Sequence, residues 1–303
     1  MLTLALDIGG TKIAVGLVDP AGTLVHTAIR PTPNGQGAEG VWAVVQQMIG
    51  HVAHAAGGAI RAVGIGSAGP IDLATGTVSP INIASWRRFP LRERVAAAVP
   101  GVPVELAGDG LCMALGEHWR GAGRGADFLL GMVVSTGVGG GLVLDGAPYH
   151  GRTGNAGHVG HVVVEFDGQR CSCGGRGCLE TVAAGPWMTR WAVANGWAAT
   201  PGADAVALAE AAGAGDPVAV RAFRRGATGL AAMIASVAAV CDLDRVVIGG
   251  GVAKAGRVLF DPLEAALRVY AGLDFIHDLR VTPAALGGDA GLIGAAALVS
   301  SVT

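Results

Sequence analysis

The chain has 303 residues, of which 51% are hydrophobic and 15% charged, and its formal net charge is −2. That length allows one large or two medium domains with a substantial core. Because lysine and arginine form no block, nothing in the charge pattern favours nucleic acid as a partner. The longest apolar run, Gly229–Cys241, is too short to cross a bilayer, and the N-terminus lacks the basic start of a signal peptide. We therefore expect a cytoplasmic globular protein that binds neither membrane nor nucleic acid.

The first thirty or so residues predict an antiparallel meander. Strand-forming apolar runs at Leu2–Leu6, Ile13–Val18 and Leu24–Ala28 are separated by turn signals. The first turn, Asp7–Lys12, reads DIGGTK. Its adjacent glycines let backbone N–H groups approach an anion, and its threonine adds a hydroxyl donor. Its aspartate needs a metal ion or a metal-bound water to reach a phosphate. The turn therefore predicts a phosphate-binding site.

Beyond the polar loop at Pro31–Gly40, helical and strand patterns alternate. The sequence Gly108-Asp109-Gly110 closes one predicted strand and leaves the aspartate free of side-chain crowding. By itself this pattern fits an ordinary turn aspartate better than a catalytic one. The glycine-rich Gly121–Gly125 predicts a hinge between two halves of the chain. The predicted helices are Val41–Ala56, Leu91–Val99 and Leu111–Trp119, and the predicted strands are Ala62–Ser67 and Val102–Ala107.

The second half repeats the pattern of strand, glycine-rich turn and strand. Leu129–Val134 and Leu142–Leu144 flank the turn Ser135–Gly141, which reads STGVGGG. Two such hairpins suggest a duplicated domain that clamps the phosphates of a nucleotide between its copies. A third cluster, Gly249–Gly251, follows the strand Arg245–Ile248 and could pack against adenine or ribose. The remaining predicted helical segments are Pro186–Val240 and Ala290–Val299.

Three of the five cysteines, Cys171, Cys173 and Cys178, lie within eight residues of one another, which suits a metal better than a disulfide. His161 is the obvious fourth donor for a tetrahedral zinc site. Because a site with four protein ligands has no open position for water or substrate, we expect structural zinc rather than a zinc enzyme or a redox centre. An odd number of cysteines also favours a reducing compartment.

Together these motifs resemble the ROK family, whose name stands for repressors, open reading frames and sugar kinases. The similarity spans nearly the whole chain. A His-x9-Cys-x-Cys-x4-Cys pattern with glutamate two residues after the last cysteine is the family's zinc signature. The matching segments are LALDIGGTKIAVGLVD, STGVGGGLVLDG, GHVGH followed by CSCGGRGCLE, VVIGGG, and DAGLIGAA.

The resemblance implies an actin-like ATPase fold, in which two ribonuclease-H-like α/β domains hold a sugar and ATP in a cleft. We place the smaller domain at residues 1–118 plus 287–303, closed by a returning C-terminal helix. The larger domain then covers 119–286 and carries the zinc loop at 161–178. The family also implies a homo-oligomer, either a dimer or a tetramer.

The implied activity is phosphorylation of a primary, C6-type hydroxyl of a hexose-like sugar, with ATP and Mg²⁺. Asp109 takes the position of the family's catalytic base, and His161 serves both the zinc ion and the sugar pocket. The positions that would bind the nucleotide are Asp7, Gly9, Gly10, Thr11, Lys12, Thr136, Gly137, Gly250 and Gly251. The positions that would bind the substrate are Gly69, Asn82, Gly108, Asp109, His158, His161 and Glu180.

Two positions depart from the family pattern. Gly108 stands where the family usually has asparagine, whose side chain would bind a ring hydroxyl near C3. His158 replaces a glutamate that would contact hydroxyls around C1 to C3, and this histidine resembles that of N-acetylmannosamine kinases in the family. The two changes favour a modified hexose, such as N-acetylmannosamine, an amino sugar or a seven-carbon cyclitol, over glucose.

Three other functions are considered for a chain with these motifs: an ordinary glucokinase, a sugar sensor and a transcriptional repressor. An ordinary glucokinase remains the main alternative within the kinase class. A non-catalytic sugar sensor is motivated by Gly108 and His158, but the retained Asp109 and phosphate-binding residues argue against it. A transcriptional repressor would carry a helix-turn-helix domain before the DIGGTK turn, and only six residues precede Asp7.

Overall fold

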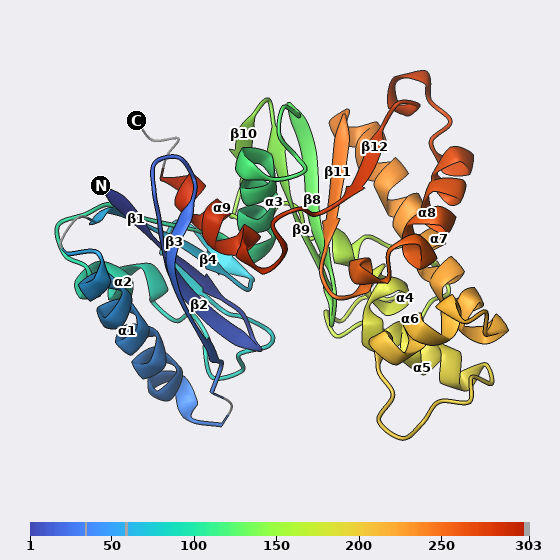
Figure 1. The fold of residues 1–303 in the computed structure, drawn as a ribbon, viewed down its shortest axis with the longest axis horizontal. Helices are drawn as coiled ribbons and strands as arrows, with labels where there is room; N and C mark the ends of the chain where they lie inside the picture. The colour runs from blue at the N-terminus through green and yellow to red at the C-terminus, as the bar shows by residue number, and fades with distance from the viewer. Residues whose placement is uncertain (34, 58–59, 300–303) are drawn as a thin grey trace. The chain divides into compact units, whose positions relative to one another are not determined.

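The computed structural model describes residues 1–33, 35–57 and 60–299, and the chain divides into two compact units (Figure 1). The first unit comprises Met1–Gly125, Gly141–Gly157 and the chain from Leu286 onward. The second comprises Ala126–Gly140 and His158–Ala285. This division differs from the boundaries expected from sequence chiefly in joining Gly141–Gly157 to the first unit. The expected domain end at residue 303 lies outside the described residues. Within those ranges, no helix is both long and apolar enough to cross a membrane.

A five-stranded sheet in the order β3-β2-β1-β4-β7 forms the centre of the first unit. Its first three strands make the antiparallel meander predicted from the sequence, and β4 and β7 extend the sheet in parallel. A small separate sheet pairs β5 with β6. The strands are β1 (Leu2–Ile8), β2 (Lys12–Val18), β3 (Leu24–Pro31), β4 (Ile60–Ser67), β5 (Ile71–Asp72), β6 (Thr77–Val78) and β7 (Val104–Gly108).

Helices cover both faces of this sheet, and the alternation of side chains along β4 shows which helix lies on which face. Val63 and Ile65 join the apolar core that includes α1 and α2. Gly64 and Gly66 face the other way, where the backbone of α9 and the side chain of Cys112 on α3 leave no room for larger residues. The helices are α1 (Gly37–Ala55), α2 (Leu91–Ala98), α3 (Asp109–Arg120) and α9 (Ala290–Leu298), with the short 3₁₀ turn η4 (Gly287–Asp289) before α9.

The same alternation of side chains shows to which face of the sheet the side chain of Asp7 points. Leu4, Leu6 and Ile8 of β1 are buried in the core with α1. Asp7 lies between Leu6 and Ile8 in the strand, so its side chain points to the opposite face of the sheet, which α3 and α9 cover. A predicted phosphate-binding carboxylate is therefore placed at the end of a buried strand, beside two packed helices.

The second sheet has the order β10-β9-β8-β11-β12. Strand β11 pairs in parallel with both β8 and β12, and β10 pairs antiparallel with β9. Strand β9 passes from the second unit into the first at Gly140–Gly141. The strands are β8 (Phe128–Val134), β9 (Val138–Leu144), β10 (Ala147–Tyr149), β11 (Arg245–Gly249) and β12 (Arg280–Pro283).

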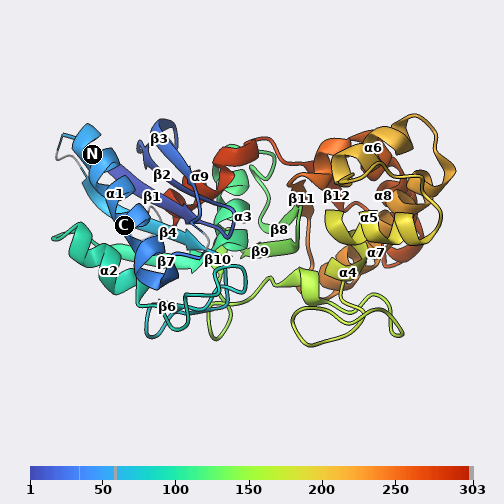
Figure 2. The same ribbon diagram turned by 90° about the horizontal axis from the view of Figure 1, so that it is seen from below.

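Helices α4 to α8 complete the second unit, and α7 is the longest, with 25 residues (Figure 2). Asp216 begins α7 by accepting hydrogen bonds from the N–H groups of Val218 and Ala219, as an aspartate N-cap does. Gly229 on α7 allows close packing of Val182 from α4. The elements are η1 (Val159–His161), α4 (Glu180–Ala183), α5 (Gly185–Ala194), α6 (Ala205–Gly213), α7 (Pro217–Cys241), η2 (Val252–Ala255), α8 (Arg257–Tyr270) and η3 (Asp274–Ile276).

The second glycine-rich turn is shorter than the sequence predicts. The prediction of a turn over Ser135–Gly141 was wrong for its last four residues, because β9 already begins at Val138. Gly141 has a packing role instead: a Cβ atom there would overlap the backbone of Leu111 in α3. Glycines in a strand often mark such close backbone approaches, and composition alone does not distinguish them from a turn.

Candidate functional site

The DIGGTK turn between β1 and β2 forms a tight, well-supported loop. The N–H of Gly9 donates to the carbonyl of Lys12 at 3.0 Å and closes the turn. The hydroxyl of Thr32, at the end of β3, donates to the carbonyl of Gly9 at 2.6 Å. Thr11 and Lys12 are exposed at the end of the loop. The turn is therefore held by its neighbours, while Thr11 and Lys12, two of the residues predicted for phosphate, are exposed.

Asp7 lies beside a second carboxylate, that of Asp109. Burial, which is the largest cause, and the negative charge of Asp109 together raise the pKa of Asp7 from 3.8 to about 6, while the nearby Lys12 opposes the shift. The sequence predicted roles for both carboxylates, and the structure shows that they lie close enough to influence each other.

Asp109 is the first residue of α3, directly after β7. Its Oδ1 atom accepts a hydrogen bond from the N–H of Gly110 at 2.8 Å, and its side chain is exposed. Gly108 is the N-cap of the helix, with φ −66° and ψ 146°, an extended conformation open to any residue. A Cβ atom at Gly108 would meet no atom within 4 Å. The family's asparagine would therefore fit, so its replacement by glycine leaves open space beside Asp109.

Asn82, a predicted substrate residue, packs directly on the predicted phosphate turn. A Cβ atom at Gly10 would lie 2.5 Å from Cγ of Asn82, so only glycine allows this approach. Gly69, predicted for the same site, accepts a hydrogen bond from the N–H of Ile81, next to Asn82, at 3.3 Å. The first unit thus gathers Gly69 and Asn82 next to the residues predicted for the nucleotide.

In the second unit, the turn Ser135–Gly137 holds the predicted phosphate residues Thr136 and Gly137. Gly250 follows β11 with φ +96°, in the left-handed region that favours glycine, and packs on the carbonyl of Val134. A Cβ atom at Gly251 would lie 3.4 Å from the hydroxyl of Ser135. The second and third glycine clusters, well separated in sequence, are therefore adjacent in this unit.

A mainly apolar cavity of about 430 Å³ opens beside these two clusters. Thr136 and Gly251, both predicted from the sequence, line it. The other walls come from the starts of α5, α6 and η2, for which the sequence predicted no binding role. Helix packing brings these residues together, so no local signal could have found them. They are Ser135, Gly185, Pro186, Thr189, Arg190, Ala203, Asp204, Ala205, Val206 and Val252.

His158 and His161 flank the short turn η1, with ring centroids 6.4 Å apart and planes inclined by 25°. His158 is exposed, whereas His161 is partly buried. Glu180 begins α4, and its Oε2 atom accepts a hydrogen bond from the N–H of Val138 at 3.0 Å. One oxygen of this predicted sugar-binding carboxylate is thus engaged by the backbone that follows the second phosphate turn.

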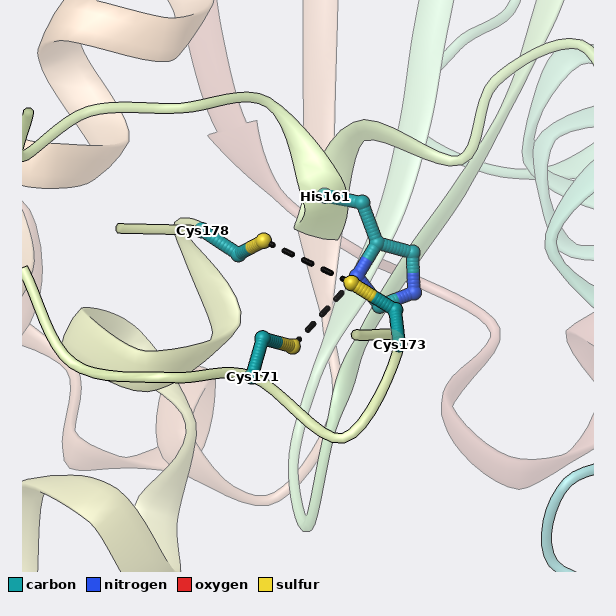
Figure 3. Close-up of side chains that lie close together, drawn as sticks. All are labelled: His161, Cys171, Cys173 and Cys178. Carbon is teal, nitrogen blue, oxygen red and sulfur yellow. Dashed lines mark hydrogen bonds between the residues drawn. The ribbon is translucent and has the colours of Figure 1, made fainter. Parts of the chain in front are cut away.

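The structure brings together the four predicted metal ligands, His161, Cys171, Cys173 and Cys178 (Figure 3). Their donor atoms all lie within 4.8 Å of one another. Nδ1 of His161 is 3.7 Å from Sγ of Cys171, and Sγ of Cys173 is 3.7 Å from Sγ of Cys178.

This donor set fits zinc. Tetrahedral bonds of the usual Zn–S and Zn–N lengths place neighbouring donor atoms roughly 3.6–3.8 Å apart. Both measured separations match that value, and three sulfur donors with one imidazole form a usual structural zinc set. The cluster is therefore compatible with a structural zinc site that would fix the loop 161–178.

Asn155, which the sequence did not single out, organises the segment Gly141–Gly157. Both side-chain groups of Asn155 bind the backbone of Ile71: Oδ1 accepts from its N–H at 2.9 Å, and Nδ2 donates to its carbonyl at 2.7 Å. These bonds tie the segment to β5 of the first unit. An asparagine between glycine and alanine in a long loop gives no local sign of such a distant partner.

Known proteins are similar to this chain over almost its full length. The ROK family matches residues 3–302. The chain belongs to the ROK family. Glucokinase from Thermotoga maritima is 36% identical over 98% of this chain and 96% of its own length. N-acetylmannosamine kinase from Yersinia pestis is 34% identical over 97% of this chain and 96% of its own.

A solved structure supports the same assignment. A ROK family glucokinase from Streptomyces griseus, in complex with glucose and AMPPNP, has a TM-score of 0.83 and 36% identity, with 98% of this chain and 99% of that chain covered. This ROK chain therefore has the actin-like ATPase fold that the resemblance implied. The expectation of two α/β units built on sheets is confirmed.

Proposed function

We propose that this ROK-family chain is an ATP-dependent kinase that phosphorylates the primary, C6-type hydroxyl of a hexose-like sugar. Two neighbouring contacts in the first unit support the proposal. Asn82, a predicted sugar residue, packs on Gly10 of the phosphate turn, and Asp109 lies near enough to Asp7 for its charge to act there. Residues predicted for the sugar, the base and the phosphates thus occupy one neighbourhood of the first unit.

Each side chain has a distinct task in this proposal. Asp109 accepts the proton of the attacking hydroxyl, since an exposed carboxylate at a helix start can reach a substrate oxygen. The hydroxyl of Thr11 and the ammonium of Lys12 bind phosphate oxygens, as do the backbone N–H groups of the DIGGTK turn other than that of Gly9, which donates to the carbonyl of Lys12. Bound ATP with Mg²⁺ supplies the transferable phosphoryl group and neutralises part of its charge.

The second unit contributes to nucleotide and sugar binding. The cavity lined by Thr136 and Gly251 has the size and apolar character suited to a nucleoside base. Gly137 and Gly250 flank it on the chain and are assigned to the same nucleotide. His158, His161 and Glu180 bind sugar hydroxyls, and zinc held by His161 and the three cysteines fixes that loop.

The substrate class follows from the two departures from the family pattern. Gly108 leaves open space where an asparagine would fit, and His158 presents an exposed imidazole instead of a carboxylate. We therefore favour a modified hexose, such as N-acetylmannosamine, an amino sugar or a C7 cyclitol, over glucose. An ordinary glucokinase is the alternative, and both glucokinases and N-acetylmannosamine kinases are among the relatives.

ADP release with a panel of acceptors tests the proposal. The panel contains glucose, mannose, N-acetylmannosamine, N-acetylglucosamine, 3-amino-glucose and a valiolone-type cyclitol. Turnover is expected on at least one of them, with kcat/KM for a modified sugar above that for glucose. A preference for glucose would establish the ordinary glucokinase, and no turnover on any acceptor would favour the non-catalytic sugar sensor.

Two further properties belong to the same proposal. We place the protein in the cytoplasm, where the clustered cysteines, all free thiols in the described chain, stay reduced. As in the family expectation, we propose a dimer or tetramer, which light scattering at working concentration would identify. A monomer at that concentration would exclude the oligomer.

A further inference from the structure

The turn Ser135–Gly137 is held from outside by segments that the proposed function assigns to the sugar side. Besides the bond from the N–H of Val138, the carboxylate of Glu180 lies so close to Gly137 that a Cβ atom there would be 2.7 Å from Oε2. On the other side, Gly160 of η1 packs against the carbonyl of Val138 so tightly that no Cβ would fit. Val138 is therefore held between α4 and η1.

Glu180 has a second neighbour at its other oxygen. Oε1 lies 3.9 Å from Sγ of Cys171, one of the four clustered donors. Glu180 also begins α4 only two residues after Cys178, so the loop 161–178 fixes where the helix starts. A single carboxylate thus links the metal-binding loop to the predicted phosphate turn.

Two backbone hydrogen bonds also support the turn. The N–H of Ser135 donates to the carbonyl of Gly137 within the turn at 2.9 Å, and the N–H of Gly185 donates to the carbonyl of Ser135 at 2.8 Å. Gly137 has no side chain that could add a contact. The Glu180 carboxylate is the charged acceptor at this turn, and a hydrogen bond to an ionised acceptor is about twice as strong as a neutral one.

We propose that Glu180 is a positioning residue for the nucleotide: its Oε2 atom orients the Ser135–Gly137 turn to receive phosphate even when no sugar is bound. This inference rests on the proposed function, because it assumes that the turn binds the nucleotide. It assigns Glu180 a task beyond sugar binding. Oε1, which lies 3.9 Å from Sγ of Cys171, is the oxygen that the proposed function assigns to a sugar hydroxyl, so the two ligands would share one carboxylate.

Nucleotide affinity in the absence of sugar distinguishes this task from sugar contact alone. The dissociation constant of AMPPNP with Mg²⁺ is measured by calorimetry for the wild type, Glu180→Ala and Glu180→Gln. We expect Glu180→Ala to weaken binding about tenfold, the usual effect of losing a charge-assisted hydrogen bond. Glu180→Gln keeps a neutral acceptor for the N–H of Val138, so its dissociation constant should lie between those of the wild type and Glu180→Ala.

Glu264→Ala serves as the matched comparison, because Glu264 is an exposed glutamate on α8 whose carboxylate pairs with Arg268 at 3.4 Å, and α8 carries none of the residues assigned to the sugar or the nucleotide. It should leave the AMPPNP dissociation constant within twofold of the wild type. Zinc content measured on every sample separates loss of the loop from loss of the bond. If Glu180→Ala does not fold, Glu180→Gln carries the test, with a threefold weakening expected.

Failure of the positioning role and failure of the proposed function give different results. Wild-type affinity for AMPPNP in a zinc-loaded Glu180→Ala, or in Glu180→Gln where that variant carries the test, overturns the positioning role and leaves the kinase intact. A wild type that binds no AMPPNP overturns the proposed function and this inference with it.

Discussion

Gly291 of α9 lies so close to Asp7 of β1 that a Cβ atom there would be 2.6 Å from Oδ2 of the carboxylate. The helix backbone therefore covers the side chain, and this burial is the main reason that the pKa of Asp7 rises to about 6. The charge of Asp109 adds to the shift. A carboxylate retained in such a place costs stability, which is the pattern expected of a functional residue.

Replacing this carboxylate should change the pH dependence of stability. Because the folded-state pKa of Asp7 is above its unfolded value of 3.8, its favourable contribution is complete below that value and is lost as pH rises through about 6. Asp7→Asn should therefore raise the free energy of unfolding at pH 8 by up to about 3 kcal/mol, and by less than about 1 kcal/mol at pH 4. Urea denaturation without Mg²⁺ at both pH values measures the difference.

Gln46→Ala, on the exposed face of α1, is the control for that experiment. It removes no titratable group, so it should shift the unfolding free energy equally at both pH values. An Asp7→Asn variant with the same stability change at pH 4 and pH 8 would contradict the raised pKa. The variant should also lose kinase turnover, so that stability and activity change in opposite directions.

Local pattern was enough to predict much of the fold, whereas the roles of the individual site residues stay predictions. The antiparallel meander, the helix after Asp109 and the four metal donors each depend on short-range spacing, and all three are present. Features that depend on tertiary packing were not predictable. Gly141 looked like a turn residue, but its glycine allows contact with Leu111, and Asn155 gave no sign of its bonds to Ile71.

The metal cluster predicts about one zinc ion per chain, measured by elemental analysis of protein purified without added metal. The Cys173→Ser variant should lose most of the bound zinc, because Cys173 supplies one of the four ligands. Because Cys173 is exposed, the substitution should not disturb the core. Cys241→Ser, which changes a cysteine outside the cluster, should keep the zinc of the wild type. A metal-free wild type with full activity would refute the site.

The assignment of Asp109 as the base predicts a selective loss of turnover. Asp109→Asn preserves size and the hydrogen bond from the N–H of Gly110, but its amide does not accept the proton of the attacking hydroxyl. We expect kcat to fall by at least ~10² while the affinity for AMPPNP stays near that of the wild type. Steady-state kinetics with the best acceptor of the panel measures the change. Near-normal turnover would exclude Asp109 as the base.

Glu117 on α3 is fully buried and joins two segments that are far apart in the chain. Its Oε2 atom accepts from the N–H of Ala122, and its Oε1 atom accepts from the N–H of Leu286, both at 2.8 Å. Glu117→Ala removes both acceptors and leaves a cavity, so we expect a loss of about 3 kcal/mol in the free energy of unfolding. Glu117→Gln should lower the free energy of unfolding by less than Glu117→Ala does.

Denaturant titration measures both Glu117 variants, with Glu105→Ala, an exposed position on β7, as the control. That control should change stability by less than about 0.5 kcal/mol. A Glu117→Ala variant as stable as the control would show that the two hydrogen bonds contribute nothing to the first unit.

Gly108 provides the sharpest test of substrate choice. Its extended backbone and the open space around its Cα admit asparagine, a preferred N-cap residue, so Gly108→Asn should fold and gain a few tenths of a kcal/mol in stability. The new amide fills the space beside Asp109 and can bind a ring hydroxyl. We therefore expect the ratio of kcat/KM for glucose to that for the best modified sugar to rise by about tenfold or more. Gly108→Ala adds only a methyl group and should shift the ratio much less. If Gly108→Asn leaves the ratio within twofold of the wild type, the glycine does not determine specificity, and the preference must come from His158 or other residues.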